Sequence, residues 1–171
     1  MLKKLVVAAA LAASAAGAFA QQYPTKPVQM IVPFSAGGPT DVVARSLAQA
    51  MSKAIGGNIV VDNRPGAGGT LGAEMVKNAQ PDGHTLLLHH IGMATAPALY
   101  RSLRFNPLND YEYIGLVVDV PMTLIGRKDL PPNTFKELLP YIKSNAQKIN
   151  LANAGIGSAS HLCGLLLMSA M

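Results

Sequence analysis

One stretch near the amino terminus constrains the fold most, because an apolar run, a glycine-containing turn and an amphipathic helix follow one another within residues 28–55. Residues 30–32 predict a strand that ends at Pro33, since proline cannot donate a ladder hydrogen bond. Apolar residues then recur on one helical face across residues 43–54, and Gly56-Gly57 predicts the end of that helix. The expected unit is therefore strand, turn, helix.

The turn itself, residues 35–40, brings two glycines to the start of the helix, with Pro39 in the first helical turn. Unpaired N–H groups and the positive end of the helix dipole would then meet there, which favours an anion. An ordinary tight connection is the alternative for this segment alone. Two further segments repeat the pattern: a strand at 59–61 before residues 62–70, and a strand at 149–152 before residues 153–160. Three such loops predict one site ringed by backbone donors, beyond the carboxyl ends of the strands.

The first 20 residues predict a cleavable export signal and no part of the fold. Lys3 and Lys4 precede an apolar stretch over residues 5–16, and Ala18-Phe19-Ala20 forms an A-x-A cleavage site before Gln21. No cysteine follows that site, which argues against a lipid anchor. The mature chain is expected to be soluble and periplasmic.

Charge and cysteine content exclude some classes of protein. The formal charge of +5 falls to +3 when two lysines leave with the signal segment, and the remaining basic residues are scattered. This distribution argues against a nucleic-acid partner, while a mild positive excess suits an acidic ligand. The single Cys163 cannot form an internal disulfide, and its leucine-rich surroundings predict a small buried hydrophobe.

The remainder of the chain continues to alternate between predicted strands and helices, which indicates an α/β fold. Strands are expected at 85–88, 113–118 and 122–125, and helices at 95–100, after Thr134 and at 162–168. Thr134 and Glu137 have the spacing of a capping box. A shift in pattern after Arg104 predicts a domain boundary. The last apolar helix stops at Met171 without a cap, from which a fragment of a longer protein is expected.

Five motifs resemble the extracytoplasmic solute receptors of tripartite tricarboxylate transporters. The first two are Tyr23-Pro24-Thr25-Lys26-Pro27 and residues 32–41. The other three are Asn63-Arg64-Pro65-Gly66-Ala67-Gly68-Gly69, Pro81-Asp82-Gly83-His84-Thr85-Leu86-Leu87, and Gly157-Ser158-Ala159-Ser160-His161-Leu162. The resemblance implies a type II periplasmic-binding-protein fold, with two α/β domains around a cleft and the second domain truncated. It also implies a carboxylate-bearing ligand and membrane transporter subunits as partners. Ser35, where the family often has proline, and residues 89–93 depart from the family pattern.

These expectations divide the chain into a signal peptide (1–20), a first α/β domain (21–105) and an incomplete second α/β domain (106–171). No catalytic residue, metal site or cofactor is predicted. The expected ligand-binding residues are Phe34, Ser35, Ala36, Gly37, Gly38, Thr40, Asp41, Gly68, Gly69, Thr70, His90, Ser158, Ser160 and His161.

Other functions fit the sequence less well. Residues 66–72 resemble a dinucleotide fingerprint, but the third glycine falls one position late. Ser158 and His161 suggest a secreted hydrolase, yet the nucleophile elbow lacks its second glycine. His89 and His90 suggest a metal site, although a ligand contact or a structural role is the stronger interpretation. A ligand-sensing input protein for a signalling system would use the same cleft and is the main alternative to a transport receptor.

Overall fold

The computed structural model describes residues 23–171, so the predicted signal segment lies outside the described residues. The elements are β1 (Val28–Val32), α2 (Pro39–Ile55), β2 (Ile59–Asn63), the 3-10 helix η1 (Ala67–Gly69), α3 (Thr70–Lys77), β3 (Thr85–Leu87), α4 (Gly92–Leu99), α5 (Phe135–Ser144) and α6 (Ala159–Ala170).

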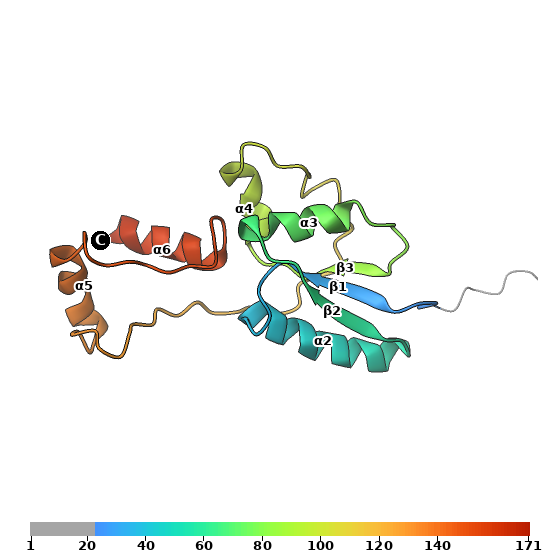
Figure 1. Ribbon diagram of the computed structural model, residues 1–171, viewed down its shortest axis with the longest axis horizontal. Coiled ribbons are helices and arrows are strands. Elements are labelled where there is room, and N and C mark those ends of the chain that lie inside the picture. Colours follow the sequence, from blue (N-terminus) through green and yellow to red (C-terminus); the bar gives the residue numbers. More distant parts are fainter. Residues whose placement is uncertain (1–22) are drawn as a thin grey trace, which may run out of the picture.

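The three strands form a parallel sheet in the order β2-β1-β3, with α2 on one face and α3 and α4 on the other (Figure 1). Gln29 of the central strand pairs with Val60 on one side and Thr85 on the other. The three strands predicted in this region are confirmed. Because all three run in the same direction, the loops that follow β1 and β2 leave the same edge of the sheet.

Two hydrophobic clusters hold the helices on the sheet. Val28, Met30 and Val32 alternate along β1 and are buried against α2. On the opposite face, Ala73 of α3 and Met93 of α4 belong to a second buried cluster. Full burial of a side chain such as Met30 contributes roughly 1.5–3 kcal/mol to the stability of the fold. The packed helices therefore hold the strands, and the loops at their ends, in place.

The expected helix ends are present. Pro39 occupies the first turn of α2, and Gly56 ends that helix in the left-handed conformation with φ 67°. Before α5, the Thr134 hydroxyl accepts a hydrogen bond from the Glu137 N–H at 3.3 Å. The Glu137 carboxylate returns to the N–H of Asn133, one residue earlier than the capping box predicts.

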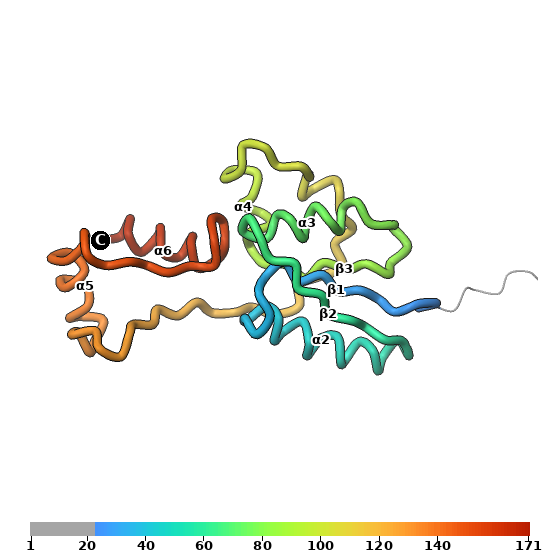
Figure 2. The backbone as a smooth tube through the Cα atoms, in the orientation of Figure 1, coloured from blue at the N-terminus to red at the C-terminus, as the bar shows by residue number. Residues whose placement is uncertain are grey.

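Three predicted strands are wrong: residues 113–118, 122–125 and 149–152 form none. Their apolar content is that of strands, but a strand requires hydrogen bonds to a neighbour. Residues 112–127 instead form a long exposed segment without regular structure that leads away from the sheet toward α5 (Figure 2). Within residues 23–171 this segment has no strand beside it, because the sheet contains β1, β2 and β3 alone.

One predicted helix is present with a different start, and the predicted burial of Cys163 is wrong. The helix expected at 95–100 begins earlier, at Gly92, because the His90 Nδ1 atom accepts a hydrogen bond from the Gly92 N–H and so caps its first turn. Pro97 consequently lies inside the helix. Cys163, expected to be buried, is exposed, because little covers this side of α6.

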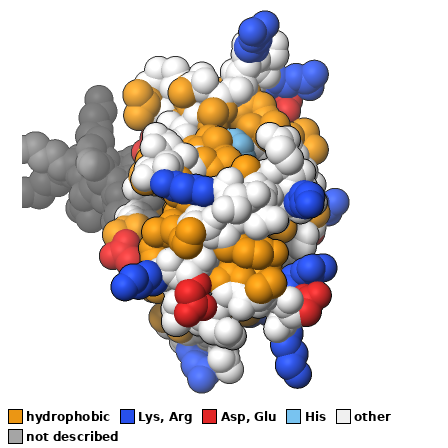
Figure 3. All heavy atoms as spheres, turned by 90° about the vertical axis from the view of Figure 1, so that its left-hand side faces the viewer, with side chains coloured by type: hydrophobic (Ala, Val, Ile, Leu, Met, Phe, Trp, Pro, Cys, Tyr) orange, Lys and Arg blue, Asp and Glu red, His pale blue; other side chains and the backbone are white. Residues whose placement is uncertain are grey.

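The α5 and α6 helices lie apart from the sheet, beyond the loop that precedes α6 (Figure 1). Phe135, Leu166 and Met168 on these helices are more than half exposed. Hydrophobic patches interrupted by basic side chains are visible on this end of the molecule (Figure 3). None of the helices within residues 23–171 combines the length and hydrophobicity that crossing a membrane requires.

Candidate functional site

The first loop of the candidate site joins β1 to α2. Ser35, Ala36 and Gly37 are exposed, and Gly37 has a left-handed backbone with φ 79°. The N-cap of α2 is Gly38, which has no side chain to cap the first turn. Among the described residues, the N–H groups of Ser35 and Ala36 donate to no internal acceptor. This loop therefore presents backbone donors at the positive end of a long helix.

The second loop follows β2 and leads through η1 into α3. Gly68 and Gly69 both have left-handed backbones, with φ 63° and 99°. The Gly69 N–H donates to the Gly66 carbonyl at 2.9 Å, and the Thr70 hydroxyl donates to the Ala67 carbonyl at 3.0 Å. The Gly68 N–H has no internal acceptor within the described chain. Of the predicted residues Gly68, Gly69 and Thr70, only Gly68 has a backbone N–H that is available to a ligand within the described chain.

The third loop precedes α6. Ser158 is 1 % exposed, and its hydroxyl accepts from the His161 N–H at 3.2 Å as the cap of α6. The Ser160 hydroxyl lies 3.1 Å from that of Ser158 and accepts from the Ala154 N–H at 3.0 Å. The His161 Nδ1 atom accepts from the Gly157 N–H at 3.2 Å. These three predicted site residues give the loop its shape through contacts within itself.

The second and third loops touch each other. The Tyr100 hydroxyl lies 2.8 Å from the Ala67 carbonyl oxygen and 2.7 Å from that of Ile156, so it stands between the two loops. A hydroxyl carries one proton, so it donates to one of these carbonyls at a time. A β-carbon at Gly68 would overlap the Ile156 carbonyl oxygen, so the close approach requires glycine. The structure brings the two predicted loops to one place.

Phe34 and the two histidines border the first two loops. The Phe34 ring stacks on His90 with ring centroids 4.2 Å apart, and it meets His89 edge-on at 5.4 Å. A β-carbon at Gly69 would come within 2.6 Å of the His89 Nε2 atom and 3.1 Å of the Phe34 ring. The His90 N–H donates to His89 Nδ1 at 2.9 Å. These rings therefore form an apolar, aromatic boundary beside the backbone donors.

Both imidazoles are held neutral. Burial lowers the pKa of His89 below its usual value, and burial together with the neighbouring His89 lowers the pKa of His90 to about 4. Since an unfolded histidine titrates near pH 6.5, the unfolded chain binds more protons between about pH 6.5 and pH 4. The contribution of these two histidines to the free energy of unfolding is therefore complete above about pH 6.5, and it is lost as the pH falls toward 4.

We expect the free energy of unfolding, measured by urea titration, to decrease from about pH 7 to about pH 4.5. His90→Asn keeps an acceptor for the Gly92 N–H but no longer titrates, so the decrease should be smaller. Asp41 and Asp82 contribute little in this range. Their pKa values fall to about 2 from an unfolded value near 3.9, so the stability that they contribute is lost mainly below pH 4.5. Equal pH dependence in His90→Asn and the wild type would contradict this assignment.

Two alternative chemistries find little support in the geometry. Within residues 23–171, no hydrogen bond joins the Ser158 hydroxyl to the His161 imidazole, whose Nδ1 atom is engaged by the Gly157 N–H. The same part of the chain holds no group of three or more His, Cys, Asp or Glu side chains able to hold a metal ion.

Comparison with known proteins identifies the family. The sequence profile described as "Tripartite tricarboxylate transporter family receptor" matches residues 43–171. The chain belongs to this receptor family. The resemblance seen in the sequence is therefore confirmed. Members of the family are solute-binding receptors of transport systems, and its solved members include periplasmic binding proteins.

Two solved structures and one sequence relative place this receptor more closely. The periplasmic binding protein BugD is 59 % identical with a TM-score of 0.84, covering 86 % of this chain and 50 % of BugD. MatC of Rhodopseudomonas palustris, solved with bound malate, is 41 % identical with a TM-score of 0.80 over the same shares. A UPF0065 protein of Agrobacterium vitis is 51 % identical over 149 residues, covering 87 % of this chain and 43 % of that protein. The periplasmic-binding-protein fold is thus confirmed, and the chain spans about half the length of these relatives.

Two residues that the sequence did not mark contact the loops of the candidate site. Asn63, at the end of β2, donates from Nδ2 to the Phe34 carbonyl and so joins the first loop to the second strand. Asn63 is the first residue of the motif at residues 63–69, and this position could have marked it as a site residue. Tyr100 follows α4 and reaches both glycine loops. Nothing in its sequence context indicated that contact.

Proposed function

We propose that the protein is a periplasmic solute-binding receptor that captures a small organic acid by its carboxylate and delivers it to the membrane subunits of a tripartite tricarboxylate-type transporter. The observation that carries the proposal is the contact between the second glycine loop, where the Gly68 N–H is available, and the loop before α6. The first loop, with available N–H groups at Ser35 and Ala36, leaves the same edge of the sheet as the second loop. Backbone donors at helix starts suit a carboxylate.

Family membership and the malate carried by MatC support an acid as the ligand. Residues 21–105 would form the first domain and residues 106–171 the start of the second, with the cleft between them. Residues 1–20 would direct export. Of the predicted ligand-binding residues, Ser35, Ala36 and Gly68 would supply backbone donors from the first two loops. The loop at residues 158–161 would meet the ligand as the domains approach.

A thermal-shift screen tests this function on the protein expressed to the natural end of its gene. We expect malate or another acid in a panel of di- and tricarboxylates, acidic amino acids and aromatic acids to raise Tm. A ligand at 100 times its Kd adds roughly 2.7 kcal/mol of stability. At roughly 2–4 °C per kcal/mol the shift would be several degrees.

The matched control is malamide, which keeps the shape of malate and removes both charges. A carboxylate site predicts no shift with malamide. A panel in which every acid leaves Tm unchanged would contradict the proposal, and so would an equal shift with malate and malamide.

A further inference from the structure

Asp41 is buried at the start of α2, although it lies beside the loop that is expected to bind an anion. Its carboxylate is 3 % exposed. One oxygen accepts from the Gly37 N–H at 2.8 Å and from Arg45 Nε at 2.9 Å, and the other accepts from Asn63 Nδ2 at 3.0 Å. The carboxylate is therefore occupied by internal donors and compensated by the Arg45 charge, so it faces the protein instead of the ligand.

Asn63 completes the same network from the neighbouring strand. Its Nδ2 atom donates to the Phe34 carbonyl at 3.0 Å as well as to Asp41, and its Oδ1 atom accepts from Arg45 Nη2 at 3.2 Å. Phe34 precedes the first loop and Asp41 follows it. One side chain on β2 therefore contacts both ends of the β1–α2 loop.

The middle of the loop is held by two hydrogen bonds: the Gly38 N–H donates to the Ser35 carbonyl at 3.3 Å, and the Gly37 N–H donates to Asp41. Gly37 is exposed, has a left-handed backbone, and has nothing within 4 Å of the position a β-carbon would take. Packing therefore does not fix its peptide plane, and glycine has more conformational freedom than other residues. The hydrogen bond from the Gly37 N–H to the Asp41 carboxylate is the shorter of the two and has a charged acceptor, so it contributes most to that orientation. It leaves the preceding N–H groups of Ser35 and Ala36 available to a ligand.

We propose that Asp41 and Asn63 are positioning residues, which hold the β1–α2 loop against the end of β2 in the conformation that receives the ligand. The inference rests on the proposed function for its consequence in binding. Its structural part, the ordering of Gly37 by Asp41, is independent of any ligand.

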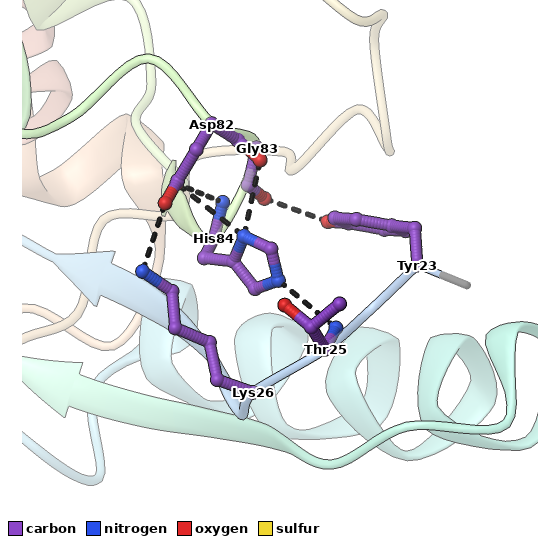
Figure 4. Close-up of polar contacts among 6 residues, drawn as sticks. All are labelled: Tyr23, Thr25, Lys26, Asp82, Gly83 and His84. Atoms are coloured by element: carbon purple, nitrogen blue, oxygen red, sulfur yellow. Dashed lines mark hydrogen bonds and ion pairs between the residues drawn. The ribbon is translucent and has the colours of Figure 1, made fainter. Parts of the chain in front are cut away.

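A second carboxylate provides a matched control. Asp82 accepts from the His84 N–H at 3.0 Å and from Lys26 Nζ at 2.8 Å (Figure 4), and its pKa is lowered to about 2, as is that of Asp41. It precedes β3, at the opposite end of the sheet from the glycine loops. Asp82→Asn thus removes an ion pair and a backbone contact of the same kind, at a more exposed carboxylate, without touching the candidate site.

The experiment compares Asp41→Asn, Asn63→Ala and Asp82→Asn, each made in the protein expressed to the natural end of its gene. Two quantities are measured: hydrogen exchange at the Gly37 amide by NMR, and malate affinity by calorimetry. The amide of Ile31 in the buried central strand reports whether each variant is folded. We expect Gly37 exchange to accelerate at least about 10-fold in Asp41→Asn, because the amide loses its charged acceptor.

Malate affinity should fall at least about 10-fold in both Asp41→Asn and Asn63→Ala, while Asp82→Asn stays within about twofold of the wild type. Equal Gly37 exchange in Asp41→Asn and the wild type would overturn the positioning role. Equal loss of affinity in Asp82→Asn and Asp41→Asn would overturn it too, because general destabilisation would then explain both. If the wild type binds no acid in the panel, the proposed function fails, and Gly37 exchange alone decides the positioning role.

Discussion

Replacing Gly68 by alanine is expected to weaken binding of the acid about 100-fold, equivalent to about 2.7 kcal/mol. The added β-carbon would overlap the Ile156 carbonyl oxygen and lie 2.6 Å from the Tyr100 hydroxyl. That hydroxyl is itself fixed between the Ala67 and Ile156 carbonyls. The loop before α6 could then no longer approach the second glycine loop, and the contacts of the closed state would be lost. Calorimetry with malate measures the effect.

Gly56→Ala is the matched control for this substitution. Gly56 has φ 67° and Gly68 has φ 63°, so alanine pays a similar left-handed penalty of about 1–2 kcal/mol at both positions. A β-carbon at Gly56 would meet nothing within 4 Å. Both variants should therefore lose stability, and Gly68→Ala alone should lose affinity. Affinities of the two variants within about twofold of each other would contradict a role for the close approach at Gly68.

Gly38→Val should weaken binding at least about 10-fold while the fold is retained. Gly38 is the N-cap of α2 and has φ −76°, so valine meets no left-handed penalty there. Its β-carbon would lie 3.2 Å from the Ser35 carbonyl oxygen, and the branched methyl groups would extend over the exposed loop. They would obstruct the approach of a carboxylate to the backbone donors at Ser35 and Ala36.

Gly38→Ala separates this obstruction from the loss of the cap, because alanine and valine are similarly poor N-cap residues. Calorimetry with malate should show near-normal affinity for Gly38→Ala and weak binding for Gly38→Val. If valine binds malate as tightly as alanine does, the ligand does not approach this loop.

The first half of the fold could be predicted from the sequence because local signals there agree with tertiary packing. The apolar run at residues 30–32, the helical face of α2 and the glycine at its end all indicate the same unit, which the structure confirms. The strands expected at 113–118, 122–125 and 149–152 failed for the opposite reason. An apolar run indicates a capacity to pair, and pairing depends on a second strand that local sequence does not specify.

The candidate site was predictable in outline and not in detail. Glycine loops before helices indicated where backbone donors would gather, and the structure brings the second and third loops into contact. The Asp41 carboxylate accepts a hydrogen bond from Asn63, which lies 22 residues later in the sequence. The reach of Tyr100 to Ile156 spans 56 residues. Contacts at such separations follow from the packed fold and leave no periodic signature in the sequence.

The most direct test of the account is a crystal structure of the protein, expressed to the natural end of its gene, with the acid that gives the largest thermal shift. We expect a ligand carboxylate oxygen about 2.7–3.2 Å from the backbone nitrogens of Ser35, Ala36 or Gly68, with the loop at 158–161 closed over it. An acid bound away from these loops, or held in place by side chains alone, would contradict the central claim.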